Sequence, residues 1–213
     1  MEVLVQSGEA VIAAIAEAVA TNGYAVTDGF LPAAEVLKMQ EEASALFRQG
    51  QFSRAGIGKG SDHRVNQEVR RDHIQWLDHT APPEAFRSFF GKLAELIQHF
   101  NRSYYLGLRD MELHLAVYPE GAFYKRHLDA FKHHRARKLS VVFYLNTGWQ
   151  SSDGGQLRLY LPQENGSEAA LDVEPIAGRL ACFNSHTIEH EVLPARRERY
   201  SLTGWLKDEL ALF

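Results

Sequence analysis

YKRHLD, at residues 124–129, is the stretch from which the fold and the chemistry of this sequence can be predicted. His127 and Asp129 are two residues apart, so on an extended strand both side chains point to one face and can bind the same metal ion. A third ligand must come from elsewhere, and His190, in the HEV segment at 190–192, is the candidate. Two imidazoles and one carboxylate on one face of an octahedron suit Fe(II) and leave positions open for other ligands.

Simpler interpretations of these histidines stay open. His127 and Asp129 alone would also suit a hydrogen-bonded pair at the end of a strand. His186 competes with His190, because the two are four residues apart, a spacing that resembles a zinc motif. A zinc protease motif needs glutamate directly after its first histidine, however, and Thr187 stands there instead. This difference favours His190.

The segment RYSLTGW at residues 199–205 predicts a cation in the same interior. On a strand, alternate residues share a face, here Arg199, Ser201, Thr203 and Trp205. A guanidinium that faces a pocket can donate two parallel hydrogen bonds to one carboxylate. In the segment 138–146 a row of large apolar residues alternates with Ser140 and Tyr144, which puts a phenol on the face opposite that row. Three strands therefore turn polar groups toward one interior.

Closely spaced strands fill the second half of the chain, with turn signals and no helical pattern between them. The predicted strands are 111–118, 123–129, 138–146, 156–161, 170–174, 179–184 and 199–207. Many short antiparallel strands around a ligand site are typical of a jelly roll, the double-stranded β-helix of cupins. Apolar periodicity predicts helices over 9–21, 33–48 and 86–100, and a short strand is expected at 71–77. The fold class is therefore mainly β with flanking helices.

Composition favours one domain and excludes several function classes. The 213 residues, 45% of them hydrophobic, suit a single domain over 1–213, with a helical support over 1–105 and the jelly-roll core over 106–213. The net charge is −4 and the pI is near 6.2, so the sequence lacks the excess of positive charge expected of a protein that binds nucleic acid or an anionic membrane. The only cysteine, Cys182, lies in an apolar run and cannot form an internal disulfide. No signal peptide or membrane span is recognised, so a reducing cytoplasm is expected.

These motifs together resemble the 2-oxoglutarate and Fe(II) dependent oxygenases. Within that superfamily the chain is most similar to the prolyl 4-hydroxylases that act on hypoxia-inducible factor, in a bacterial version. The resemblance runs from about residue 50 to about residue 207 and rests on six short segments: VYP at 117–119, YKRHLD at 124–129, YLN at 144–146, GGQLR at 154–158, HEV at 190–192 and RYSLT at 199–203. Their combination is far more specific than the two histidines and the aspartate alone.

The resemblance implies roles for individual residues. It implies that His127, Asp129 and His190 are the catalytic metal ligands, and that the cofactors are Fe(II), 2-oxoglutarate and O₂, with ascorbate as a further candidate. It implies that the C5 carboxylate of 2-oxoglutarate is bound by Arg199 and Tyr144, with Thr203 assisting and Tyr118 nearby. Because Asp129 is present, the halogenase variant of the family, which has a small residue there, is disfavoured.

The resemblance also implies a protein substrate with a proline in an exposed loop, and the bacterial branch implies elongation factor Tu. Family residues at the substrate entrance match Arg137, Trp205 and Tyr124. A mobile finger over about 51–78 is expected to fold over the substrate. The basic run 132–138, which contains Arg137, is also interpretable as a solvated loop. Two other functions stay open: hydroxylation of a free amino acid or small metabolite, and a non-enzymatic cupin-like metal or oxygen sensor.

Overall fold

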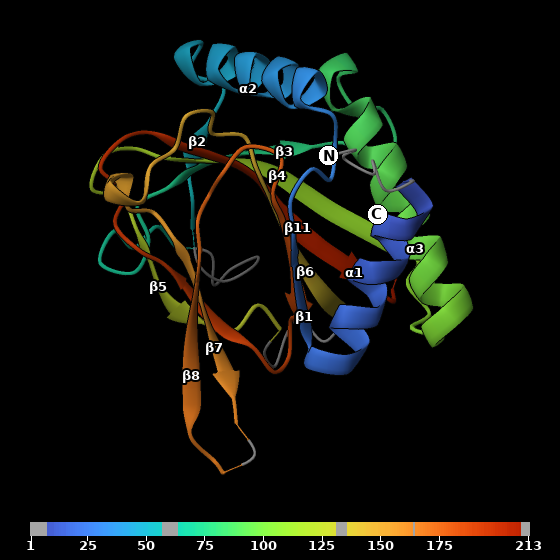
Figure 1. Cartoon of the computed structure of the whole chain (residues 1–213). Coiled ribbons are helices and arrows are strands. Elements are labelled where there is room, and N and C mark those ends of the chain that lie inside the picture. The colour runs from blue at the N-terminus through green and yellow to red at the C-terminus, as the bar shows by residue number, and fades with distance from the viewer. Residues whose placement is uncertain (1–7, 57–63, 131–135, 164, 210–213) are drawn as a thin grey trace, which may run out of the picture.

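The computed structural model describes residues 8–56, 64–130, 136–163 and 165–209 (Figure 1). The helices are α1 (Gly8–Asn22), α2 (Ala33–Arg48) and α3 (Arg87–Tyr104), with the short 3₁₀ helices η2 (Glu84–Phe86) and η3 (Ser151–Asp153). The strands are β1 (Tyr24–Thr27), β2 (Ser53–Arg54), β3 (His73–Leu77), β4 (Asp110–Tyr118), β5 (Tyr124–His127), β6 (Arg137–Tyr144), β7 (Leu157–Pro162), β8 (Glu168–Val173), β9 (Leu180–Asn184), β10 (Glu189–Val192) and β11 (Arg199–Lys207).

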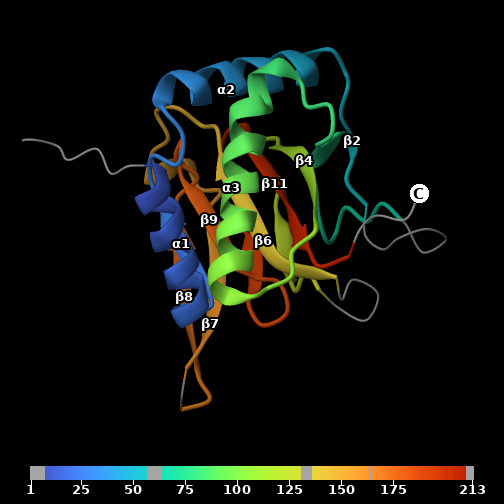
Figure 2. The same cartoon turned by 90° about the vertical axis from the view of Figure 1, so that its right-hand side faces the viewer.

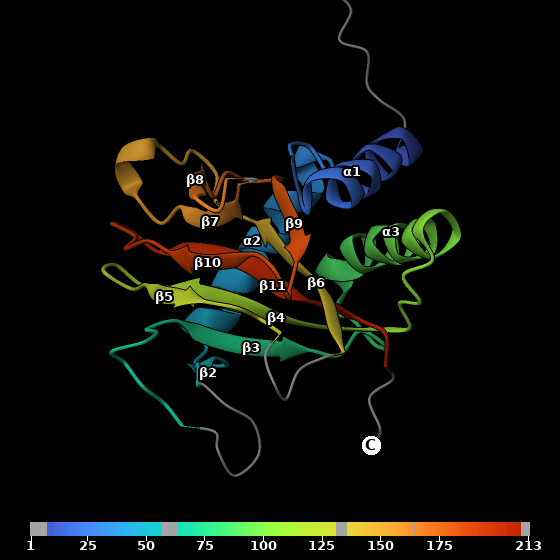
Figure 3. The ribbon, with the colours of Figure 1, turned by 90° about the horizontal axis from the view of Figure 1, so that it is seen from below.

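The strands form two antiparallel sheets. The larger sheet has the order β1-β9-β6-β11-β4-β3-β2, and the smaller one has the order β5-β10-β7-β8. Seen from below, the smaller sheet lies on one side of the larger sheet, and α1 and α3 lie on the other side (Figure 3). Two facing antiparallel sheets with helices outside confirm the predicted jelly roll. The β7–β8 hairpin extends beyond the rest of the molecule (Figures 1 and 2).

The helices bury the outer face of the larger sheet. Figure 2 shows α1 and α3 side by side across this face, with α2 along its upper edge. Leu113, Leu115 and Val117 alternate along β4 and all belong to the apolar core that the helices complete. Helix α3 contributes the aromatic stripe of Phe89, Phe90 and Phe100 to that core. The flanking helices therefore support the sheet and leave its other face to the site.

The inner face of the larger sheet is packed against the smaller sheet. Its apolar part combines Ala116 and Tyr118 of β4 with residues of the smaller sheet such as Leu157, Leu159 and Val192. Because side chains alternate along a strand, the inner positions of β4, β6 and β11 all face the smaller sheet. Buried polar residues occupy several of these positions: His114, Ser140, Arg199 and Ser201. The functional site is expected among them.

The structure adds strands that the sequence did not predict and corrects several boundaries by a few residues. Strands β1, β2 and β10 were not among the predicted strands; β1 pairs with β9, β2 with β3, and β10 with β5 and β7. The strand predicted over 123–129 was wrong at its end, because β5 stops at His127 and Asp129 lies in the bend that follows. Part of the predicted finger over 51–78 lies outside the described residues. Within the described residues, no helix is both long enough and apolar enough to cross a membrane.

Gly204 is expected to be essential for stability, because it lies where the central strand β11 contacts β4. A Cβ atom there would overlap the carbonyl oxygen of Glu112 and lie 2.8 Å from the Cα of Leu113. We expect Gly204→Ala to lower the free energy of unfolding by about 1–3 kcal/mol or more, measured by urea denaturation. Gly91→Ala is the control, since nothing lies within 4 Å of that position in α3, and it should raise stability by up to about 1 kcal/mol. Equal effects of the two substitutions would contradict this explanation.

Candidate metal and co-substrate site

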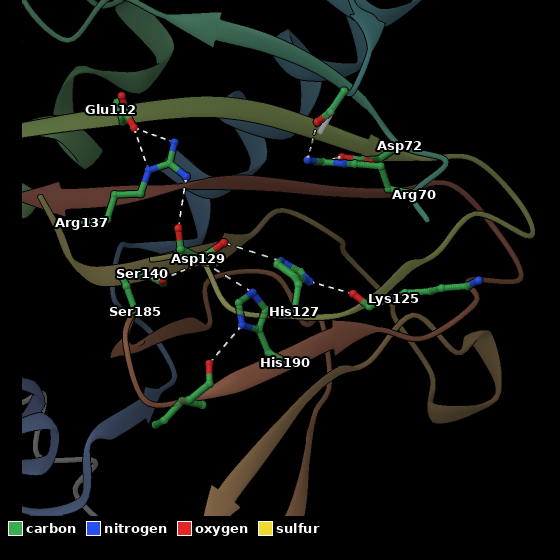
Figure 4. Close-up of polar contacts among 12 residues, drawn as sticks. Arg70, Asp72, Glu112, Lys125, His127, Asp129, Arg137, Ser140, Ser185 and His190 are labelled. Carbon is green, nitrogen blue, oxygen red and sulfur yellow. Dashed lines mark hydrogen bonds and ion pairs between the residues drawn. The ribbon is translucent and has the colours of Figure 1, made fainter. Parts of the chain in front are cut away.

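His127, Asp129 and His190 meet at the edge of the smaller sheet that faces β6 and β11. His127 on β5 and His190 on β10 are direct cross-strand partners, and Asp129 follows the end of β5. Potential ligand atoms of the three side chains all lie within 4.8 Å of one another. Nε2 of His127 is 3.5 Å from one carboxylate oxygen of Asp129, and Nε2 of His190 is 3.5 Å from the other (Figure 4). The structure therefore brings together all three residues predicted as ligands.

Hydrogen bonds orient each of the three side chains (Figure 4). Nδ1 of His127 donates to the carbonyl oxygen of Lys125 at 2.7 Å, and Nδ1 of His190 lies 3.4 Å from that of Ile188. A proton on Nδ1 leaves the Nε2 lone pair of each ring for a metal ion. The hydroxyl of Ser140 donates to Asp129 at 2.7 Å and is itself 2.8 Å from the Ser185 hydroxyl.

The protonation states of these groups fit a divalent metal ion. Burial and, after it, the neighbouring His127 lower the pKa of His190 to about 4, so its imidazole is neutral at pH 7. Burial alone would raise the pKa of Asp129, but the two imidazoles and the Ser140 hydroxyl outweigh burial and hold that pKa below its usual range. Two neutral imidazoles and one carboxylate are the donor set that suits Fe(II). The residues present therefore fit this ion.

A second polar cluster lies deeper between the sheets, around Arg199 at the start of β11. Arg199 is only 1% exposed, and its Nε donates to the carbonyl oxygen of Gly155 at 2.8 Å. Its guanidinium carbon lies 4.9 Å from the ring of Tyr118 and 5.1 Å from the ring of Tyr144. Gly155 permits this packing, since a Cβ atom there would lie 3.0 Å from Cδ of Arg199, and its positive φ of 67° also favours glycine.

Two donors of this cluster have no partner among the described residues: Nη2 of Arg199 and the hydroxyl of Tyr144, both fully buried. Burial raises the pKa of Tyr144 to about 12, so its phenol keeps a proton to donate. Within the described part of the chain, no carboxylate forms a salt bridge with Arg199. Buried polar groups are normally paired, and a charge-assisted pair of donors suits a carboxylate ligand. Tyr118, on the neighbouring strand, is the cross-strand partner of Arg199 and packs beside its guanidinium.

Thr203 connects the two clusters along β11. It lies between Arg199 and Trp205 on the inner face, and its hydroxyl is 3.3 Å from that of Ser201. Trp205 is the cross-strand partner of Ser140, which binds Asp129, so the order along the strand runs from the guanidinium of Arg199 to the three clustered candidate ligands. A small dicarboxylate bound at Arg199 would thus extend past Thr203 toward these ligands.

The three residues expected at the substrate entrance surround the same cluster. Tyr124 stacks on His127 with ring centroids 3.7 Å apart. The guanidinium of Arg137 lies 3.4 Å from the ring centre of Trp205 and donates to Glu112 through Nε at 2.9 Å and Nη2 at 2.7 Å. Its Nη1 is 3.5 Å from the backbone oxygen of Asp129 (Figure 4).

Sequence reasoning missed an ion pair that contacts this site. Arg70 forms a two-fold ion pair with the buried Asp72, with N–O distances of 2.8 and 2.6 Å (Figure 4). Its guanidinium lies 4.1 Å from the ring centre of Tyr124. The two residues lie in a charged run that gave no sign of burial. The competing histidine, His186, is exposed and lies outside the cluster.

Comparison with known proteins gives a consistent result. Residues 113–207 match the model of the 2OG-Fe(II) oxygenase superfamily. A solved prolyl-4-hydroxylase of Pseudomonas putida is 41% identical and superposes with a TM-score of 0.83, covering 93% of this chain and 100% of that one. A prolyl hydroxylase of Trichoplax adhaerens, solved with a peptide fragment of hypoxia-inducible factor, is 30% identical with a TM-score of 0.84, covering 94% of this chain and 90% of that one.

Curated proteins with similar sequences carry names of the same kind, and they are longer than this chain. The hypoxia-inducible factor prolyl hydroxylase of Caenorhabditis elegans is 31% identical over 198 residues, which cover 88% of this chain. The match covers only 27% of that protein, and 44% of the human Egl nine homolog 1. The chain thus spans between a quarter and a half of the length of these relatives.

Proposed function

Because this chain belongs to the 2-oxoglutarate and Fe(II) dependent oxygenase superfamily, we propose that it is a peptidyl-prolyl 4-hydroxylase. It would hydroxylate a proline in a protein loop and convert 2-oxoglutarate and O₂ to succinate and CO₂. The observation that carries this proposal is the alignment of two sites on one inner surface: three clustered ligands, and a buried arginine and tyrosine with unpartnered donors. Similarity to prolyl hydroxylases supports the choice of substrate class.

In this proposal His127, Asp129 and His190 hold Fe(II), and the single negative charge of Asp129 leaves the ion a net charge of +1. Bound there with 2-oxoglutarate and O₂, the ion supplies an oxidant that can break an unactivated C–H bond. Arg199 and the phenol of Tyr144 bind the C5 carboxylate, and Thr203 and Tyr118 line the path to the ion. Arg199 and Tyr144 are buried between the sheets, where charge-assisted hydrogen bonds are stronger than in water.

The substrate side of the proposal concerns Tyr124, Arg137 and Trp205. These side chains lie around the three proposed ligands, where a proline ring could approach the ion. We propose elongation factor Tu as the protein partner, in keeping with the resemblance to the bacterial branch of the family, and ascorbate as the reductant that keeps the iron ferrous. A reducing cytoplasm as the place of action fits the single, fully buried thiol of Cys182, whose pKa burial raises to about 12.

The test is a coupled measurement of protein oxidation and succinate. The protein is loaded anaerobically with Fe(II) and 2-oxoglutarate, mixed with elongation factor Tu and exposed to air, and both products are followed by mass spectrometry. We expect a gain of one oxygen on a proline, in step with succinate. A parallel sample with free L-proline tests the small-metabolite alternative. Succinate without any oxidised proline would overturn the proposed substrate, and iron binding without succinate would favour a sensor.

A further inference from the structure

Three aromatic rings lie together at one end of the inner surface. They belong to Trp76 on β3, His114 on β4 and Trp205 on β11, and we call them the aromatic triplet. Trp76 and His114 are cross-strand partners with ring centroids 4.9 Å apart. The ring of Trp205 lies 5.7 Å from that of His114 and 6.3 Å from that of Trp76. Figure 3 shows the three strands, with β4 between β3 and β11.

The triplet adjoins the proposed metal site. Trp205 is the cross-strand partner of Ser140, whose hydroxyl donates to Asp129. Cross-strand partners point to the same face of a sheet, so Trp205 and the rings beside it lie on the face that carries the ligands. Anything bound to the triplet would therefore lie next to the reacting group of a substrate.

Exposure within the triplet is uneven. His114 is 3% exposed and Trp205 is 8% exposed, whereas Trp76 is 51% exposed. An indole that packs against other rings on one side and meets solvent on the other presents a flat apolar surface. Tryptophan in such a position is the residue most enriched at binding hot spots. The exposed ring of Trp76 is thus available to a partner, while the two buried rings fix its position.

Two ring nitrogens of the triplet have no hydrogen-bond partner among the described residues: Nδ1 of His114 and Nε1 of Trp205. Burial, followed by the charge of Arg70, lowers the pKa of His114 to about 3, so its ring is neutral. Nε1 of Trp205 can only donate, and a neutral imidazole nitrogen either donates or accepts according to its tautomer. Both nitrogens lie in the buried part of the triplet, so the surface that a partner can reach is the ring of Trp76.

The charges around the triplet are already paired. Nε and Nη2 of Arg137, which covers the ring of Trp205, both donate to Glu112. Lys207 is bound by Asp110 at 2.9 Å and by Glu112 at 3.5 Å. An acidic residue of a substrate would have to compete with these carboxylates. The surface therefore favours an uncharged ring over an acidic side chain.

We propose that the aromatic triplet is a subsite for the residue next to the target proline: Trp76 selects an aromatic side chain, and the buried rings of His114 and Trp205 hold the Trp76 indole in place. This inference deepens the proposed function and rests on it. Trp76 is then a specificity-determining residue of the hydroxylase. An aromatic neighbour of the proline covers the exposed indole and adds an offset or edge-to-face ring contact.

The test uses binding, so that it does not depend on turnover. Fluorescent 15-residue peptides carry one central proline, with phenylalanine or alanine on either side of it, in a neutral polar background. Their Kd values are measured by anisotropy with protein that holds Mn(II) and 2-oxoglutarate without O₂. For one of the two positions we expect phenylalanine to bind about three- to tenfold more tightly than alanine. Trp76→Ala should lose this preference, and Trp76→Phe should keep most of it.

Leu37→Ala is the matched control, because Leu37 is 46% exposed and lies on α2, behind the sheet. It should keep the preference of the unchanged protein. His114→Leu removes the ring that packs against Trp76 and should reduce the preference for phenylalanine. An unchanged preference in this variant would overturn the role of His114.

The outcomes separate this inference from the proposed function. Equal Kd values for the phenylalanine and alanine peptides, or a preference that survives Trp76→Ala, would overturn the subsite. The same peptides are then incubated with Fe(II), 2-oxoglutarate and air. Proline oxidation without a preference for phenylalanine would leave the hydroxylase and remove the subsite. A preference in binding without oxidation of any peptide would leave the subsite and contradict the prolyl hydroxylase.

Discussion

Replacing Arg199 with methionine is expected to raise the KM for 2-oxoglutarate at least about 30-fold, because losing one partner of a buried charge pair costs about 2–5 kcal/mol. Methionine fills much of the same volume but offers no donor to a carboxylate. The loss should appear mainly in KM, since the side chain binds the end of the co-substrate that does not react. The free protein should not lose much stability, because the buried guanidinium has no carboxylate partner among the described residues.

The measurement combines succinate formation at increasing 2-oxoglutarate with thermal unfolding in its presence and absence. The unchanged protein should be stabilised by 2-oxoglutarate, and Arg199→Met should not. Arg158→Met is the control, because Arg158 pairs with Asp172 on the exposed side of the smaller sheet. It should leave KM unchanged. A normal KM in Arg199→Met would show that the co-substrate binds elsewhere.

Asp129→Asn is expected to abolish hydroxylation and to weaken Fe(II) binding by more than the roughly 10–100-fold that loss of a residue orienting a ligand costs. Asparagine keeps the shape of the side chain and can still accept the hydrogen bond of Ser140. It removes the only negative charge among the three ligands. Two neutral imidazoles alone bind a divalent ion weakly. The first effect of the substitution should therefore be a higher Kd for Fe(II), and the loss of hydroxylation should follow from it.

Anaerobic titration with Fe(II), and with Mn(II) as a stable substitute, measures this effect directly. Asp172→Asn, a change of the same kind on the exposed strand β8, should bind both ions like the unchanged protein. Circular dichroism would verify that Asp129→Asn is folded. Full affinity for the ion in the folded variant would refute the assignment of Asp129 as a ligand.

Much of this site was predictable because alternation along strands fixes which side chains share a face. The spacing of His127 and Asp129 predicted that the two side chains face the same metal ion. The prediction of a shared direction holds although β5 ends between them, because a bend just past the strand still turns the carboxylate toward His127. Arg199 and Thr203 were predicted to share a face for the same reason, and β11 runs through both. The jelly roll followed from regular strand spacing. The roles of these residues stay predictions until the experiments above are done.

Other parts could not be predicted, because they depend on contacts between distant segments. Strand β1 has four residues, and its pairing with β9 brings together positions about 155 residues apart. Arg70 and Asp72 resembled a solvated charged run, and only the fold shows that they are buried against Tyr124. Trp76 could be assigned to a strand, but its ring contacts with His114 and Trp205 require the order of β3, β4 and β11.

The direct pairing of His127 with His190 means that an ion bound as proposed would also affect the lifetime of the polypeptide. Strand β5 is four residues long, forms the edge of its sheet and pairs with β10 through an irregular register, with one further bridge from Tyr124 to Arg70. Short edge strands are among the first segments to open in local unfolding, which exposes their amides to hydrogen exchange and their backbone to proteases. An ion bound by residues of both strands would hold this pair together. Under the proposed assignment, shortage of iron would shorten the survival of the enzyme as well as stop its turnover.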